Sequence, residues 1–189
     1  PSLEELCAGK KDIVIISSDH TRPVPSRVTM PILLHHIHSA APEARVRILV
    51  ATGMHRPSTH EELVNKYGEE IVANEEIVMH VATDDSMMKK IGTLPSGGEC
   101  IINKIAADCD LLLAEGFIEP HFFAGFSGSR KSVLPGIASY KTIMYNHNGQ
   151  FVNDSHSRAG NLCHNHVSED MFAAAEMAHL AFVLNVVLN

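Results

Sequence analysis

The chain has 189 residues, enough for about one domain, and 45% of them are hydrophobic, which is ample for a core. The net charge of -7 and a pI near 6.0 argue against a nucleic-acid partner, because such proteins neutralise phosphates with clustered Lys and Arg. No stretch reaches the ~20 apolar residues that cross a bilayer, and no signal pattern opens the chain, so we expect no membrane partner.

Short apolar runs alternate with helical patterns along the chain. In order, the predicted elements are a strand over Asp12–Ser17, a helix over Pro31–Ser39, a strand over Arg47–Ala51, a helix over Ser58–Tyr67, and strands over Ile77–Val81 and Leu111–Phe117, followed by a helix over Ser168–Ala178 and a strand over Phe182–Leu188. This alternation predicts an α/β fold of the Rossmann-like class, with a largely parallel sheet and flanking helices, as a single domain over residues 1–189.

Local signals mark the helix ends. Pro31 suits a first helical turn, and Ser58 and Glu61 have the spacing of a capping box, with Gly68 just beyond the helix that they open. Ser168 followed by two acidic residues is favourable at the start of the last helix.

Polar loops follow three of the predicted strands. These loops are Asp19–Arg22, Gly53–Arg56 and Glu119–His121. Since ligands of open parallel sheets bind at the carboxyl ends of the strands, we expect the three loops to meet at one edge. His55 and His121 therefore stand apart from most of the thirteen histidines, although a structural and a functional role are equally open for them from the residues alone.

The segment Glu119–Gly136 concentrates glycines and cations. Gly125 and Gly128 are expected to let the backbone approach a ligand, Arg130 offers a fork of donors, and Lys131 offers an amine that becomes more nucleophilic when it is desolvated beside another cation. The segment is not a P-loop, because Arg130 stands where the second glycine of that motif is required. A small anion fits this loop better than a nucleoside triphosphate.

The Asp19–Pro23 segment has two interpretations. It is either a turn in which Asp19 and Thr21 bond the nearby backbone, or an anion cradle in which Arg22 holds a carboxylate or phosphate and Thr21 adds a donor.

The four cysteines, Cys7, Cys100, Cys109 and Cys163, are widely spaced with no C-x-x-C pair, so neither a zinc site nor a disulfide framework is indicated. A reducing cytoplasm is the simplest location.

Taken together, four motifs resemble the nickel-pincer lactate racemase family. They are Ser18–Ser26, Gly53–Arg56, Glu119–Gly136 and the downstream His147, and they stand in the order and approximate spacing of that family. The resemblance covers essentially the whole chain and identifies it as the N-terminal catalytic domain of a longer protein. The missing initiator Met and the apolar strand pattern at the end lead us to the same expectation.

The resemblance implies a cofactor and roles for eight residues. The cofactor is a nickel pyridinium-3,5-bisthiocarboxylic acid mononucleotide, tethered at Lys131 through a thioamide, with His147 as the fourth nickel ligand. His55 and His121 match the pair of acid/bases that serve the two enantiomers of a 2-hydroxy acid during reversible hydride transfer. Asp19, His20, Thr21 and Arg22 would hold the cofactor, and Arg22 would also face the substrate carboxylate.

The sequence departs from the family pattern at two places. Ser129 stands where the family often has glycine, and Asn165–Ser168 differs from the usual Pro-Val-His or Pro-Ile-His. The implied partners are a small hydroxy acid and the proteins that make the cofactor. Because the family draws substrate-binding residues from a second domain, this chain alone should bind substrate poorly or not at all.

Two alternatives remain open. A non-catalytic domain that binds a phosphorylated or carboxylate small molecule would also explain the cationic loop, but it gives His55, His121 and His147 no joint purpose. An epimerase of a longer sugar acid would keep the chemistry and change only the substrate.

Overall fold

The computed structural model describes residues 1–187 and contains a five-stranded parallel sheet. Its strands lie in the order β3-β2-β1-β6-β9, with bounds β1 Asp12–Ser18, β2 Arg45–Ala51, β3 Glu76–Met79, β6 Leu111–Phe117 and β9 Leu180–Val186. Two antiparallel pairs lie outside this sheet, formed by β4 Met88–Thr93 with β5 Glu99–Asn103, and by β7 Pro120–His121 with β8 Gly125–Phe126. The predicted α/β class is confirmed.

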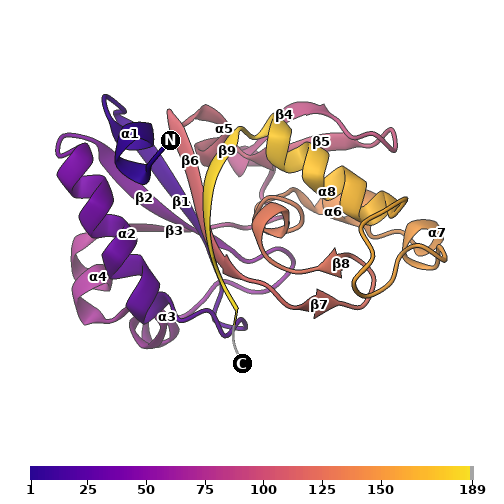
Figure 1. Ribbon diagram of the computed structural model, residues 1–189, viewed down its shortest axis with the longest axis horizontal. Helices are drawn as coiled ribbons and strands as arrows, with labels where there is room; N and C mark the ends of the chain where they lie inside the picture. The colour runs from indigo at the N-terminus through magenta and orange to yellow at the C-terminus, as the bar shows by residue number, and fades with distance from the viewer. Residues whose placement is uncertain (188–189) are drawn as a thin grey trace.

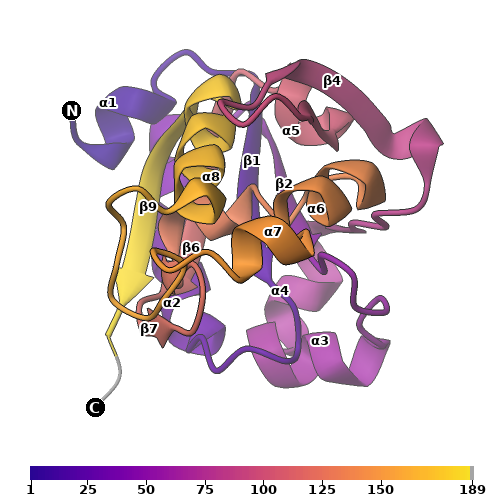
Figure 2. The same ribbon diagram turned by 90° about the vertical axis from the view of Figure 1, so that its right-hand side faces the viewer.

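Helices cover both faces of the sheet (Figures 1 and 2). On one side lie α1 Leu3–Cys7, α2 Ser26–Ala40, α3 His60–Tyr67 and α4 Glu69–Asn74; on the other lie α5 Lys104–Asp108, α6 Tyr140–Asn146 and α8 His166–Met177, with α7 Gly149–Val152 beyond them. Two short 3-10 turns, η1 Asp85–Met87 and η2 Ser129–Ser132, complete the elements. None of the helices within residues 1–187 has the length and apolar character needed to span a membrane.

The core is split into two halves by the sheet. Successive side chains of a strand point to opposite faces, so Ile13 and Ile15 of β1 pack with Met30 of α2, whereas Val14 packs in the other half with Met171 of α8. All of these side chains are fully buried. Burial on both faces explains why the parallel strands read as continuous apolar runs in the sequence.

The predicted strands are found, with shifts at their ends. The strand over Leu111–Phe117 is confirmed to the residue. The second strand begins at Arg45, ahead of the predicted Arg47, because Arg45 pairs with Asp12 of β1 and its backbone N–H donates to the carbonyl of Lys11 at 2.8 Å, a pairing that apolar patterning does not reveal. The last strand runs over Leu180–Val186, and the predicted end at Leu188 lies outside the described residues.

The predicted start of the α2 helix is wrong. The helix begins at Ser26, so Pro31 lies inside it instead of in its first turn. The hydroxyls of Ser26 and Thr29 both donate to the buried carboxylate of Glu115 in β6, the second at 2.6 Å to Oε2. These tertiary bonds hold the first turn in place, and they are invisible to a local reading.

The predicted caps of the other two helices also shift. The capping box of α3 is formed by Thr59 and Glu62, one residue later than predicted, and the Ser58 hydroxyl instead pairs with Nδ1 of His20 at 2.9 Å. The cap of α8 is Asn165, whose side chain accepts the Ser168 N–H at 3.1 Å. The short elements α1 and α4 to α7 and the β4–β5 hairpin were not predicted, because each is too brief to show a clear period.

Gly125 and Gly128 are needed by the chain itself. Both have positive φ, at 80° and 76°. A Cβ at Gly125 would lie 2.5 Å from the carbonyl oxygen of Asn161, and one at Gly128 would lie 2.9 Å from that of Phe117. The close approach that the sequence suggested is therefore made to neighbouring backbone.

Gly125→Ala should destabilise the protein well beyond the cost of left-handed backbone alone. Gly9 is the matched control, because it has φ 75° and a Cβ added there would meet nothing within 4 Å. We expect Gly9→Ala to lower the free energy of unfolding by about 1 kcal/mol, and Gly125→Ala by about 3 kcal/mol or more. Denaturant unfolding of the two variants measures this, and equal losses would contradict the packing argument.

His80 is a buried histidine that joins two loops. Its Nε2 donates to the carbonyl of Ala138 at 3.0 Å, and its Nδ1 lies 3.2 Å from the amide nitrogen of Asn103. Burial lowers the pKa of His80 from 6.5 to about 4, against the opposing effect of the Ala138 bond. The folded protein therefore holds this imidazole neutral.

The protein should lose stability as the pH falls from 6.5 towards 4. In this window the unfolded chain protonates His80 and the folded chain does not, so the stability present above pH 6.5 is lost as the pH falls through the folded pKa. The loss from this residue is on the order of 3 kcal/mol. His80→Gln should reduce the difference between unfolding free energies at neutral and acidic pH by a similar amount, and an unchanged difference would contradict the assignment.

Candidate active site

A cavity of about 270 Å³ opens at the carboxyl ends of β1, β2 and β6. Two of the three loops predicted to meet at this edge, Asp19–Arg22 and Gly53–Arg56, supply part of its wall, which fits the rule for ligand sites in open parallel sheets. The third, Glu119–His121, does not line the cavity. Five of the eight predicted site residues line it, namely Asp19, Arg22, His55, Lys131 and His147.

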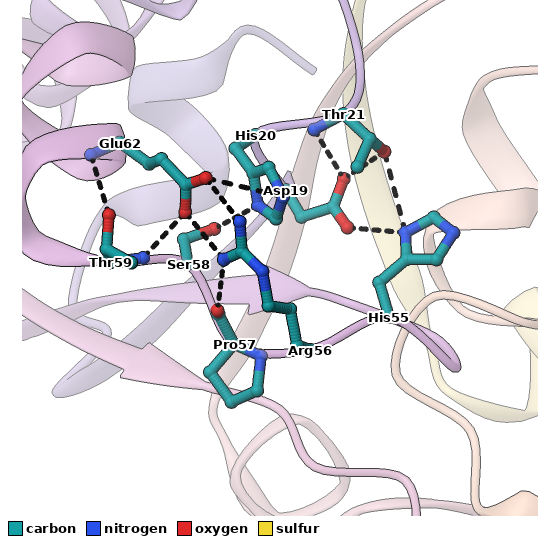
Figure 3. A network of polar contacts seen from close by, with 9 residues as sticks. All are labelled: Asp19, His20, Thr21, His55, Arg56, Pro57, Ser58, Thr59 and Glu62. Atoms are coloured by element: carbon teal, nitrogen blue, oxygen red, sulfur yellow. Dashed lines mark hydrogen bonds and ion pairs between the residues drawn. The ribbon is translucent and has the colours of Figure 1, made fainter.

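Asp19 and His55 both line the cavity and form a hydrogen-bonded pair, which Figure 3 shows. Nδ1 of His55 lies 2.6 Å from Oδ2 of Asp19, and the backbone N–H and hydroxyl of Thr21 donate to Oδ1 at 3.0 and 2.6 Å. Burial alone would raise the pKa of Asp19, but the bonds from Thr21 and His55 outweigh it and the pKa is lowered. Because a carboxylate only accepts, Nδ1 of His55 carries the hydrogen and Nε2 is left as the acceptor.

His121 lies against Lys131. The Nζ of Lys131 is 3.2 Å from Nε2 of His121, whose ring stacks on Phe122 and meets Phe123 edge to face at centroid distances of 4.7 and 4.6 Å. Burial, followed by the charge of Lys131, lowers the pKa of His121 to about 4. Burial, followed by the charges of Arg22 and Arg130, lowers the pKa of Lys131 to about 8.

His147 follows the last turn of α6 and lines the cavity as a neutral imidazole. Its backbone N–H donates to Ile143 at 2.8 Å, which fixes the residue as the helix C-cap. Burial, followed by the charge of Lys131, lowers the pKa of His147 to about 4. Its buried Nδ1 atom has no hydrogen-bond partner. A neutral imidazole is the form that binds a metal ion.

Neighbouring side chains hold the end of α6. The amide of Asn146 donates to the carboxylate of Asp170 at 3.1 Å, and that carboxylate also accepts the hydroxyl of Ser96 at 2.6 Å. Asn146 and Asp170 are both buried. His147 is thereby placed by a helix end that is itself tied to α8 and to the β4–β5 turn.

Two predicted cations have different surroundings. Arg22 is exposed and lines the cavity. Arg130 is buried, its Nη2 donates to the carbonyls of Ala124 and Phe126 at 2.9 and 3.3 Å, and its guanidinium lies 4.5 Å from the ring centre of Phe172. Arg130 thus holds the loop that carries His121 and Lys131.

His20 does not join the other predicted residues. Its Nδ1 lies 2.9 Å from the Ser58 hydroxyl, and its Nε2 is 3.6 Å from Glu62 (Figure 3). It lines a neighbouring cavity of about 410 Å³ together with Arg22 and Lys66. Its role in holding the cofactor stays a prediction, as do the roles of the other seven residues.

The sequence patterns did not reveal Glu115. This buried carboxylate lies in the cavity wall and accepts hydroxyls from Ser17, Ser26 and Thr29. The available signal was a single charge inside an otherwise apolar parallel strand, where an unpaired carboxylate would be costly.

Comparison with known proteins points to one family. Residues 1–160 match the family model of the lactate racemase N-terminal domain. Over 187 residues the chain is 72% identical to a lactate racemase of Lactiplantibacillus plantarum and 55% identical to one of Thermoanaerobacterium thermosaccharolyticum, covering 99% of this chain and 44% of each relative. It therefore spans less than half the length of these curated relatives.

Comparison with solved structures points to the same family. The lactate racemase apoprotein from Thermoanaerobacterium thermosaccharolyticum superposes with a TM-score of 0.98 at 54% identity, over 100% of this chain and 45% of that one. A Thermotoga maritima protein shares the fold, with a TM-score of 0.81 at 22% identity over 99% of this chain and 50% of that one. The resemblance read from the four motifs is confirmed, and the chain belongs to the lactate racemase N-terminal domain family.

Proposed function

We propose that this chain is the cofactor-bearing domain of a racemase that inverts lactate or a closely related 2-hydroxy acid. The observation that carries the proposal is the placement of His55, Lys131 and His147 around one cavity, with His121 in contact with Lys131. A domain that only binds an anion would use Arg22 and Lys131, but it would not need a carboxylate-oriented histidine and a second, unpartnered neutral one.

The residues present fit the proposed nickel-pincer nucleotide. His147 offers a neutral imidazole with an unpartnered buried nitrogen at the cavity, and Lys131 offers an amine there. No cluster of three or more His, Cys, Asp or Glu within residues 1–187 forms a metal site. The proposed cofactor would need only one metal ligand from the protein, because it would supply the others itself. When bound, the nucleotide supplies an acceptor for the α-hydrogen of the substrate as hydride.

Inversion moves the α-hydrogen from one face of the carbon to the other, and the hydroxyl must lose its proton as this hydrogen leaves and regain one as it returns. His55 suits the first task, because Asp19 holds its Nδ1–H and leaves Nε2 free to accept a proton. Pairing with buried Asp19 also stabilises the imidazolium that results. His121 is the proposed partner for the opposite enantiomer, and the two roles exchange when the reaction runs backwards. Arg22 is proposed to bind the substrate carboxylate.

The proposal extends to the setting of the chain. The relatives are more than twice as long as this chain, and we propose that a second domain of the full-length protein completes the substrate site and excludes water, so this chain alone would not turn over. The cofactor would come from dedicated synthesis proteins. The four cysteines are unpaired, which suits the cytoplasm.

Lys131→Ala should abolish the covalent adduct without unfolding the protein. The test is the intact mass of full-length protein made together with the cofactor pathway. Lys141→Ala is the control, because Lys141 is an exposed lysine paired with Glu99 and should leave the adduct in place. An adduct that persists in Lys131→Ala would rule out the tether, whereas loss in both variants would point to failed synthesis.

Asp19→Asn should slow turnover of protein that has acquired the cofactor. The amide cannot hold Nδ1–H of His55 as a carboxylate does, so we expect kcat to fall by about 10²- to 10⁴-fold, in the range found for acid–base groups. Thr21→Val removes only one bond to Asp19 and should cost much less. The measurement is kcat of the loaded full-length protein, and an Asp19→Asn enzyme with unchanged kcat would refute the orienting role.

A further inference from the structure

The contact between His121 and Lys131 fixes which atoms carry hydrogen. The backbone N–H of Ala124 points at Nδ1 of His121, with a nitrogen-to-nitrogen distance of 3.3 Å. A ring nitrogen that accepts a hydrogen bond carries no hydrogen of its own. A neutral imidazole has one hydrogen to place, so in His121 it must lie on Nε2. Nε2–H is the group that faces Lys131 at 3.2 Å.

This arrangement disfavours the charged form of Lys131. An ammonium group has three donors and no lone pair, so it would face Nε2–H donor to donor. A neutral amine has a lone pair that can accept this hydrogen bond. The hydrogen bonds therefore favour the free amine, which is the nucleophilic form of lysine.

The surroundings of Lys131 also favour its neutral amine form. Burial lowers its pKa, and the permanent charges of Arg22 and Arg130 lower it further. His147, the remaining titratable neighbour, is held neutral by burial. One contact favours the charged form of Lys131, because the ring of Phe123 lies 5.7 Å from Nζ and attracts a cation. This distance is near the outer limit of cation–π interactions, so the effect is small.

We infer that His121 has a second role, in cofactor attachment, where its Nε2–H holds Lys131 as a neutral amine ready to attack a thiocarboxyl carbon. This inference rests on the proposed function for the identity of the electrophile. The lone pair of Nζ forms a C–N bond to the thiocarboxyl carbon, the C–O bond of that group breaks, and its hydroxyl leaves as water with one hydrogen from the amine. The product is a thioamide, and no oxidant or reductant is consumed.

The backbone around Lys131 is set for this reaction before any cofactor arrives. The N–H of Lys131 donates to Gly128 and its carbonyl accepts the N–H of Gly136, both at 3.0 Å. His121 is clamped between Phe122 and Phe123. Amine and imidazole are thus held by separate sets of contacts, so their approach does not depend on a bound ligand.

The direct test is the reactivity of Lys131 in cofactor-free, full-length protein. Trace acetic anhydride acetylates neutral amines only, and peptide mass spectrometry reports each lysine separately across a range of pH. Lys131 should show a midpoint near 8, below the midpoint measured for exposed Lys11 in the same sample. A Lys131 midpoint equal to that of Lys11 would overturn the inference.

Variants of His121 separate the hydrogen bond from burial. His121→Phe keeps an aromatic ring without the N–H, so acetylation of Lys131 at pH 8 should fall by about 5-fold, the result of a one-unit rise in its pKa. His121→Gln keeps an N–H donor and should retain most of the reactivity. Lys66 is the internal control, being a half-buried lysine that bonds the Ser18 hydroxyl, and its acetylation should not change.

Two further outcomes distinguish this inference from the proposed function. Wild-type reactivity in His121→Phe, in a variant whose melting temperature is unchanged, would reject the role of His121 even if the loaded protein carries its adduct at Lys131. The converse result is that Lys131 is acetylated with a midpoint near 8, in a way that depends on His121, in a protein that never acquires nickel. That result would support the activated amine and would reject only the thiocarboxyl group as its target.

Discussion

One buried carboxylate links the sheet to the loop that carries much of the site. Glu115 in β6 accepts hydrogen bonds from Ser17 in β1 and from Ser26 and Thr29 in the first turn of α2. The loop that holds Asp19, Thr21 and Arg22 runs between these anchors. An unpaired carboxylate at this depth would be costly, so the three hydroxyls and the carboxylate require one another. The placement of Asp19 against His55 follows from this link.

The sequence revealed the sheet better than it revealed the helix starts. A parallel sheet buried on both faces produces unbroken apolar runs, which is why Leu111–Phe117 could be bounded to the residue. The start of α2 could not, because it depends on hydroxyls that reach a carboxylate almost ninety positions away in the chain. The predicted cap of α3 differs by one residue from the observed one because Ser58 and Thr59 are both suitable N-caps, and Ser58 instead contacts His20.

The sequence predicts which loops form the site, but not how their side chains contact one another. Strand ends located His55 and His121, and the family motifs added Lys131 and His147. What patterning could not show is the state of each group: Asp19 as the partner of His55, Arg130 bound to the carbonyls of Ala124 and Phe126, and His20 turned towards α3. These depend on side-chain contacts across loops, which no local pattern encodes.

The two proposed acid/bases stand in complementary states. His55 presents a bare Nε2 because a carboxylate holds its other nitrogen, whereas Nε2 of His121 carries hydrogen because a backbone N–H occupies its other nitrogen. The same physical rule, that one neutral imidazole has one hydrogen to place, therefore gives a proton acceptor in one loop and a hydrogen-bond donor in the other. Burial keeps His121 neutral, as it does His147.

We propose that the cavity at the strand ends holds nickel through His147. X-ray absorption at the nickel edge of the loaded full-length protein tests it most directly. We expect about one nickel per chain with one imidazole nitrogen among its ligands, and loss of that nitrogen signal in His147→Ala. A nickel spectrum that is unchanged by His147→Ala, or a nickel-free protein that racemises its substrate, would contradict it.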